Sequence, residues 1–371
     1  MKFLFIVQGE GRGHLTQAIT LEEMLLRNGH EVVEVLVGKS SSRTLPGFFN
    51  RSIHAPVKRF ISPNFQPAAD SKRPSLKKSV FYNLRKIPEY FRSMCYINQR
   101  IKETGAEIVI NFYELLTGLT YAFFRPSVPY VCIGHQYLFL HRDFEFPEKN
   151  FVQLWMLRFF TRMTAIRASK KLALSFRTME QDDVHRIVVV LPLIRQEVMS
   201  IQPEEGNYIH GYMVNSGFSD SVEKFHICHP EIPLKFFWDK ADTEEVTKVD
   251  ETLRFYQIDD IKFLNGMAGC RAYASTAGFE SICEAMYLGK PVLMVPAHIE
   301  QDCNAYDAMQ AGAGIIRDSF DLESLLRFAG RYTPNRNFTS WVRSCERRII
   351  FELEETMNVV IDEMYMVESF V

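Results

Sequence analysis

The sequence predicts an α/β protein built from two doubly wound units, in which helices cover both faces of a mostly parallel sheet. Short buried apolar runs alternate with segments of helical periodicity along the chain. The alternation starts afresh after residues 191–206, a stretch with two prolines and a glycine. Strands that alternate with helices form parallel sheets. The 371 residues also exceed the roughly 250–300 that one core usually organises.

The first unit should begin with a strand, a glycine-rich turn, a helix and a second strand. Residues 2–7 and 31–38 are the expected strands, and Gly29 suits the end of the helix between them. That helix is expected from apolar residues at helical spacing, which are Leu15, Ala18, Ile19, Leu25 and Leu26. Later strands are expected at residues 107–112, 129–134 and 171–176, and a long loop at residues 55–75, where prolines and basic residues gather.

The second unit repeats the same alternation. Its expected strands are residues 208–214, 234–238, 253–258 and 291–296. The tail from Ser340 has the pattern of one or two closing helices. We therefore divide the chain into a first unit at residues 1–195, a second unit at residues 196–339 and closing helices at residues 340–371.

Composition narrows the class of protein. With 47% apolar and 24% charged residues, a soluble globular chain is expected, and no apolar segment approaches the ~18 residues of a membrane span. The run "FLFIV" is too short for a signal-peptide core, so a cytoplasmic protein is expected. The seven cysteines include no C-x-x-C pair, which favours reduced thiols over a disulfide framework or a zinc site.

Charge is divided unevenly between the two halves. Residues 1–195 hold 28 Lys/Arg and 16 Asp/Glu, whereas the remainder holds 15 and 29. The basic half should attract an anionic partner. Residues 72–102 and 149–177 interleave basic and aromatic side chains, which is compatible with an anionic lipid surface or an anionic acceptor. Alternatively, the aromatics are core and the arginines a solvated face; nucleic acid is not expected, because no nucleic-acid-binding module accompanies the charge.

The turn "GEGRGH" places three glycines and a histidine after the first strand. Backbone at Gly11 and Gly13 can approach a ligand closely at the carboxyl end of that strand. The spacing matches neither the P-loop nor the dinucleotide fingerprint, so NAD and ATP are not expected. His14 lies in the first turn of a helix, where the helix dipole lowers the pKa of an imidazole. A neutral imidazole at pH 7 is what a general base requires. Its alternative role is to cap the helix and pack on the turn.

A second motif spans residues 270–315. The residues "STAG" end a strand and open a helix, and a helix amino end is a natural seat for a diphosphate. Glu280 and Glu284 lie one turn apart on that helix, where a carboxylate can accept the hydroxyls of a ribose. Glu300 and Gln301 follow the next strand and suit the hydroxyl pattern of a sugar.

These residues resemble the donor-binding region of GT-B glycosyltransferases, in particular the MurG-like and UDP-glucuronosyltransferase-like groups. The matching positions are Gly278, Glu284, Gly289, Pro291, Pro296, Glu300, Gln301, Asn304 and Ala305. The opening "GEGRGHLTQA" is similar to the glycine-rich motif at the amino terminus of the family. The two motifs occur in the expected order, one in each unit. The resemblance implies two Rossmann-like domains that face each other across a cleft.

The resemblance also implies roles for several residues in and around these motifs. Glu284 would hold the ribose, and Glu300 with Gln301 the donor sugar. The diphosphate would be bound by Thr276, Ala277 and Gly278, together with Asn215 and Ser216. His14 would be the base. Apart from the resemblance, Glu114 follows the expected strand at residues 107–112 and could orient the imidazole, as a carboxylate does in catalytic triads; its alternative is a solvated residue at the start of a helix. His135, in a segment similar to the family's H-E-Q, would lie near the acceptor; its alternative is a buried histidine bonded to backbone.

The activity implied is that of a hexosyltransferase-type enzyme with a nucleotide-sugar donor, UDP favoured, and an acceptor that is anionic or lipid-linked. Transfer would invert the anomeric carbon without a metal, in keeping with the lack of any D-x-D sequence. Two departures stand out: Thr276 replaces a histidine of plant-type relatives, and Thr16–Gln17 replaces a residue–proline pair. The alternatives are a sugar-nucleotide 2-epimerase of the same fold and a non-catalytic protein that binds a sugar nucleotide.

Overall fold

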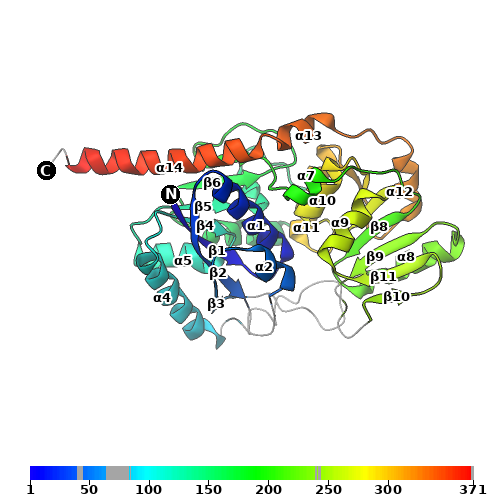
Figure 1. Cartoon of the computed structure of the whole chain (residues 1–371), viewed down its shortest axis with the longest axis horizontal. Helices are drawn as coiled ribbons and strands as arrows, with labels where there is room; N and C mark the ends of the chain where they lie inside the picture. Colours follow the sequence, from blue (N-terminus) through cyan, green and yellow to red (C-terminus); the bar gives the residue numbers. More distant parts are fainter. Residues whose placement is uncertain (40–44, 64–82, 84, 239, 241–243, 369–371) are drawn as a thin grey trace.

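The computed structural model describes residues 1–39, 45–63, 83, 85–238, 240 and 244–368, and contains two seven-stranded sheets that lie side by side (Figure 1). The strands of the first sheet are β1 (Lys2–Gln8), β2 (Glu31–Lys39), β3 (Val57–Ile61), β4 (Ile108–Phe112), β5 (Tyr130–Ile133), β6 (Lys170–Leu174) and β7 (Ile187–Val190). The strands of the second sheet are β8 (Ile209–Met213), β9 (Leu234–Trp238), β10 (Val246–Lys248), β11 (Leu253–Gln257), β12 (Ala272–Ser275), β13 (Val292–Met294) and β14 (Gly314–Ile316).

The helices connect these strands and cover both sheets. In the first half they are α1 (Arg12–Arg27), α2 (Gly47–Ser52), α4 (Ile87–Glu103), α5 (Leu115–Phe124), η1 (His135–Leu140) and α6 (Phe151–Thr164). From the linker onward they are α7 (Gln196–Ser200), η2 (Ser216–Phe218), α8 (Ser219–Cys228), α9 (Asp260–Ala268), α10 (Phe279–Tyr287), α11 (Ile299–Gln310), α12 (Leu322–Ala329), α13 (Arg336–Val342) and α14 (Cys345–Glu368).

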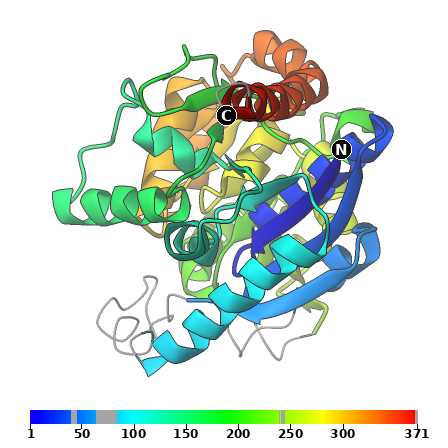
Figure 2. The same cartoon turned by 90° about the vertical axis from the view of Figure 1, so that its left-hand side faces the viewer.

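The first sheet is parallel throughout and has the order β3-β2-β1-β4-β5-β6-β7. Its interior strand β1 is buried on both faces, which explains its unbroken apolar run. Phe5 and Val7 belong to a core cluster that they share with α1, whereas Leu4 and Ile6 belong to a cluster that they share with α4. Figure 2 shows α4 (cyan) and α14 (red) on opposite sides of the blue strands.

The second sheet has the order β10-β11-β9-β8-β12-β13-β14 and is parallel except for the edge strand β10. The prediction of an α/β protein with two doubly wound parallel sheets is therefore confirmed. Gly29 and Gly289 follow the ends of α1 and α10 with φ of 75° and 70°. Helices often end at such a left-handed residue, and glycine adopts it at little cost, so the helix end predicted at Gly29 is confirmed and α10 ends in the same way.

The expected loop at residues 55–75 is wrong at its start. Residues 57–61 form β3, which pairs in parallel with β2 at the edge of the sheet. The strand has exposed Lys58 and Arg59 and a buried Phe60, so its charged face concealed it from a search for apolar runs. Residues 64–75 lie outside the described residues.

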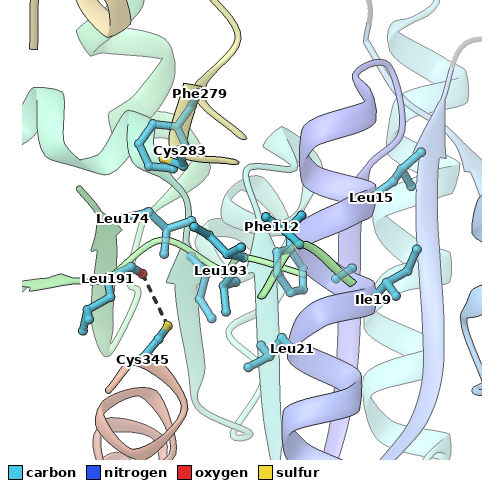
Figure 3. Packing of buried hydrophobic residues seen from close by; sticks show 14 of the residues in the cluster. Leu15, Ile19, Leu21, Phe112, Leu174, Leu191, Leu193, Phe279, Cys283 and Cys345 are labelled. Atoms are coloured by element: carbon cyan, nitrogen blue, oxygen red, sulfur yellow. Dashed lines mark hydrogen bonds between the residues drawn. The ribbon is translucent and has the colours of Figure 1, made fainter. Parts of the chain in front are cut away.

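The linker and the last helix join the two units into one core. Cluster residues from both halves pack together, and Leu191 and Leu193 of the linker lie among them (Figure 3). Figure 3 also shows Cys345, at the start of α14, whose Sγ contacts the carbonyl of Leu191 at 3.7 Å. From there α14 runs back over the first sheet (Figure 1), and Glu352 binds Lys170 at 2.7 Å. The tail from Ser340 thus contains all of α14 and only the end of α13, which begins earlier, at Arg336.

The aromatic residues of helix α6 are divided between the core and the surface. Phe160 is partly buried against the core of the first unit, as the core interpretation expects. Trp155 and Phe159, however, are 52% and 48% exposed, and their rings stack on each other with centroids 5.4 Å apart. Phe151 and Val152 at the start of the helix are exposed as well. For these outward residues the core interpretation is wrong.

Candidate functional site

The two sequence motifs meet where the first and second units touch. Helix α1 follows β1, and helix α10 follows β12, so each begins at the carboxyl end of a parallel strand, where open α/β sheets bind ligands. Gln17 of α1 donates a hydrogen bond from Nε2 to Glu280 Oε1 of α10. Gln136 of η1 donates from Nε2 to Glu300 Oε1 of α11 at 2.9 Å. We call the contact of α1 and η1 with α10 and α11 the junction.

His14 lies at this junction and is only 7% exposed. Its Nδ1 is 3.3 Å from Gln17 Oε1, and its Nε2 is 3.4 Å from Gln136 Nε2. Burial lowers the pKa of His14, and the charge of Glu300 partly opposes this. The imidazole is therefore neutral at pH 7, as a general base requires.

Tyr113 forms one wall beside the imidazole. Its ring centroid lies 5.6 Å from that of His14, and its hydroxyl is 2.8 Å from Thr161 Oγ1. The backbone of Tyr113 has φ of 60°, a conformation that a bulky residue adopts only at a cost. Such strain after a central strand is typical of functional sites, and no pattern in the sequence predicts it.

Glu114 does not orient His14, so this expectation is corrected. Its Oε1 accepts hydrogen bonds from Ser62 Oγ at 2.6 Å and from the backbone N–H of Leu116 at 3.0 Å. The carboxylate caps α5 and lies against Gly38 of β2, where a β-carbon would overlap it. Glu114 is fully buried, which also excludes the solvated alternative. Burial raises its pKa to about 7, against the two hydrogen bonds.

The predicted diphosphate seat has the geometry of an open helix end. Ala277 has φ of 60°, and Gly278 is the N-cap of α10 without a side-chain hydrogen bond to the first N–H groups. The Thr276 hydroxyl is buried and has no hydrogen-bond partner. Asn304 Nδ2 donates to the carbonyl of Ala277 at 3.3 Å and so holds the turn. Unsatisfied N–H groups at such a helix end attract anions.

The loop with Asn215 and Ser216 lies beside this turn. It follows β8, which is the sheet neighbour of β12, so both loops leave the same edge. Asn215 Oδ1 accepts from the N–H of Gly217 at 3.0 Å, and its side-chain nitrogen is not committed to that contact.

Glu284 already has a protein partner, which the sequence analysis missed. Arg195 Nε donates to Glu284 Oε1 at 2.8 Å, and Arg195 Nη1 binds Asp260 Oδ2 at 2.6 Å. Burial raises the pKa of Glu284, and the charge of Arg195 opposes the rise. A single arginine in the apolar linker "LPLIRQ" is the sequence signal for such a buried pair.

Glu300 and Gln301 face different surroundings. Glu300 reaches across the junction to Gln136, as described above. Gln301 Oε1 accepts from the N–H of Ala297 at 2.9 Å, so its oxygen holds its own loop in place. Glu300 thus contacts the first unit, whereas Gln301 is fixed through its oxygen to its own loop.

His135 is bonded to backbone, which was the alternative to a place near the acceptor. Its Nδ1 is 2.8 Å from the carbonyl oxygen of Leu174, and its ring stacks on Phe279 at 4.2 Å. Burial lowers its pKa to about 4, so the ring is neutral. His135 thus packs against Phe279, the first residue of α10.

Neither metal ligands nor a membrane span emerge from the part of the chain that the structure describes. Among those residues, no group of three or more His, Cys, Asp or Glu side chains could hold a metal ion. None of the described helices combines the length and the hydropathy that crossing a bilayer requires.

Comparison with known proteins identifies the family. Residues 1–331 match the family model described as Glycosyl transferase family 1. No match was found among curated proteins.

Solved structures with similar folds include the glycotransferase of kitacinnamycin, at 12% identity and a TM-score of 0.64 over 96% of this chain and 99% of that chain. Another is CalG4, the calicheamicin glycosyltransferase, at 14% identity and a TM-score of 0.62 over 96% and 98%. A third is Phytolacca americana UGT2, at 11% identity and a TM-score of 0.59 over 99% of each chain. Because the family model covers most of its length, the chain belongs to Glycosyl transferase family 1 and is a hexosyltransferase-type glycosyltransferase with the GT-B fold.

Proposed function

We propose that the enzyme transfers a sugar from a UDP-sugar to a hydroxyl group of an acceptor and inverts the anomeric carbon. The observation that carries this proposal is the direct contact between α1, which bears His14, and the amino end of α10, through Gln17 and Glu280. A neutral imidazole and an anion-binding helix end are the two groups that such a transfer needs.

In this proposal residues 196–339 bind the donor, residues 1–195 bind the acceptor, and residues 340–371 close the fold. The diphosphate lies on Thr276, Ala277 and Gly278, with Asn215 and Ser216 alongside and the backbone of Gly11 and Gly13 opposite. Glu284 accepts the ribose hydroxyls while it keeps Arg195, and Glu300 and Gln301 bind the sugar. Uridine donors are supported by similar structures: the Phytolacca americana enzyme is complexed with UDP-2fluoro-glucose, and Arabidopsis thaliana UGT89C1 with UDP-L-rhamnose.

The chemistry follows from the positions of the two groups. The acceptor oxygen attacks the anomeric carbon as its proton passes to His14 Nε2. The bond from that carbon to the diphosphate oxygen breaks on the opposite face, and the electron pair leaves with the diphosphate. Backbone N–H groups at the start of α10 stabilise the charge that develops there, a role that requires no metal.

A donor panel tests the proposal. Calorimetry with UDP-, GDP- and dTDP-sugars should give tight binding for a UDP-sugar, and His14→Ala should leave that affinity nearly unchanged while transfer or slow donor hydrolysis collapses. Unchanged turnover in His14→Ala would remove His14 from the base role. Incubation with donor alone separates the alternatives, because an epimerase converts the donor, whereas a non-catalytic protein only binds it.

We further propose that the acceptor is met at an anionic lipid surface, where α6 makes the contact. Phe151, Trp155 and Phe159 are 78%, 52% and 48% exposed on this helix. Residues 149–177 hold seven basic and no acidic side chains. Exposed aromatics flanked by arginine suit the interface of a bilayer that carries negative headgroups. Helix α6 also borders the site, because Phe160 packs on Tyr113, which packs on His14.

Sedimentation with vesicles tests this surface. The protein should sediment with vesicles of phosphatidylcholine and phosphatidylglycerol, less with phosphatidylcholine alone, and less when Trp155 and Phe159 are both changed to Ser. Phe351→Ser, which removes an aromatic ring that is 53% exposed on α14, is the matched control. Equal sedimentation of the wild type and the α6 variant would exclude α6 as the contact.

A further inference from the structure

Three side chains form a continuous hydrogen-bonded path across the junction. His14 Nδ1 lies 3.3 Å from Gln17 Oε1, and Gln17 Nε2 donates to Glu280 Oε1. Gln17 is only 1% exposed, so water does not compete for its amide. The path joins two helices whose residues are far apart in the sequence, because Gln17 and Glu280 are separated by 263 positions.

The path assigns the proton of the imidazole. A carboxylate only accepts hydrogen bonds, so the amide nitrogen of Gln17 faces Glu280 and the amide oxygen faces His14. That oxygen can only accept, and His14 Nδ1 therefore carries the proton. Nε2 is then the acceptor nitrogen, in agreement with the donor Gln136 Nε2 that faces it at 3.4 Å.

Glu280 is held where it can play this part. It is the second residue of α10, and its carboxylate lies against Gly13 of α1, where a β-carbon would lie 2.6 Å from the carboxyl carbon. Burial raises the pKa of Glu280 to about 7, and the charges of Glu300 and Glu284 raise it as well, while the hydrogen bond from Gln17 lowers it. Its acceptor role is thus complete only above neutral pH.

We propose that Gln17 and Glu280 are the positioning residues of the base, and that the pair fixes the Nδ1–H tautomer of His14 when the two units are in contact. This inference rests on the proposed function, since it concerns the same base. It replaces the carboxylate that the sequence placed in Glu114 by an amide from the first unit and a carboxylate from the second. The base is consequently set only when the donor-binding half is in place.

Nitrogen-15 NMR of histidine-labelled full-length protein tests the tautomer without substrate. The signals of His14 are identified by their loss in His14→Ala, and should show the proton on Nδ1 at pH 8. Gln17→Leu and Glu280→Leu should move the proton toward Nε2, whereas Glu280→Gln, which keeps an acceptor oxygen, should retain it on Nδ1. The controls are Gln99→Leu, at an exposed position of α4, and Glu323→Gln, at the exposed second residue of α12.

Turnover gives the second readout, with UDP-glucose as the donor and water as the acceptor. Misplacing a base forfeits part of its contribution, so Gln17→Leu and Glu280→Leu should lose ~10–100-fold in kcat with UDP affinity unchanged. Gln17→Glu alone should be impaired by repulsion from Glu280, and the double variant with Glu280→Gln should recover turnover, because its carboxylate accepts from His14 and its amide donates. The acidic limb of the pH profile should move to lower pH in Glu280→Gln.

The outcomes separate the two proposals. If His14→Ala retains turnover, the base itself is wrong and the inference falls with it. If His14→Ala is inactive but Gln17→Leu keeps the Nδ1–H tautomer and a kcat within about 2-fold of wild type, the inference alone is overturned. A loss confined to UDP affinity would also overturn it. Should Glu280→Leu not fold, the Gln17→Glu and Glu280→Gln pair still decides.

Discussion

The buried ion pair of Arg195 and Glu284 is expected to stabilise the contact between the linker and the second unit. Arg195 also binds Asp260, but that side chain is 38% exposed, whereas Arg195 and Glu284 are 12% and 7% exposed. Arg195→Leu puts an apolar side chain in place of the arginine and leaves the Glu284 carboxylate without its cation. Asp260 can regain water, so the effect should come mainly from Glu284.

The expected magnitude follows from the burial of Glu284. Removing one partner of a buried pair costs about 3–5 kcal/mol, because the remaining charge is neither paired nor hydrated. Burial already raises the pKa of Glu284, and the loss of Arg195 should raise it further. When the pKa of a carboxyl is higher in the folded than in the unfolded state, the protein loses stability as the pH rises from the unfolded pKa toward the folded pKa. The destabilisation should therefore be about 3 kcal/mol at pH 8 and smaller at pH 5.

Thermal unfolding followed by circular dichroism measures the effect. One kcal/mol corresponds to about 2–4 °C for a unit of this size, so the midpoint of Arg195→Leu should fall by ~6–12 °C at pH 8. Adding Glu284→Leu removes both charges and should recover much of the loss. Exposed Arg347→Leu is the control and should stay within about 0.5 kcal/mol. A midpoint within about 2 °C of wild type at pH 8, or a double variant less stable than the single one, would refute the reasoning.

Three further predictions concern the site and the first unit. His14→Ala should lower turnover by ~10²–10⁴-fold with UDP affinity unchanged, which calorimetry and a rate assay check together. Gly13→Ala should also lower turnover, because its β-carbon overlaps the Glu280 carboxylate; full activity with an unchanged dichroism spectrum would contradict this. For Glu114→Gln, the unfolding midpoint minus that of wild type should increase from pH 5 to pH 8. Burial raises the pKa of Glu114 to about 7, so wild type loses stability as this carboxyl becomes charged, whereas the glutamine does not titrate. A difference that does not depend on pH would contradict that sign.

Much of the fold could be predicted because its signals are local. The strand at residues 234–238 has the predicted bounds, and most other predicted strands differ by a residue or two at their ends. Gly29 and Gly289 end their helices because only a residue that tolerates positive φ continues the chain there. β3, with exposed Lys58 and Arg59, was missed because an edge strand need not be apolar on both faces.

The candidate site could be predicted in part. Both motifs were found, because glycines, a histidine and helix starts occur at short, recognisable spacings. The partners of the charged groups could not be predicted. Glu114 binds Ser62 and not His14, and Glu284 binds Arg195. Neither pair could be predicted, because its two residues are far apart in the sequence and no motif connects them.

The sequence by itself determined the alternation of strands and helices, the two motifs and the order in which they occur, since these depend on side-chain periodicity and backbone preference over a few residues. Only the tertiary structure decided which groups face His14. Gln17 and Glu280 meet because α1 and α10 begin at the facing edges of two sheets. A hydrogen bond of this kind forms only when whole units pack against each other. Local sequence patterns cannot predict it, because its two residues are far apart in the sequence.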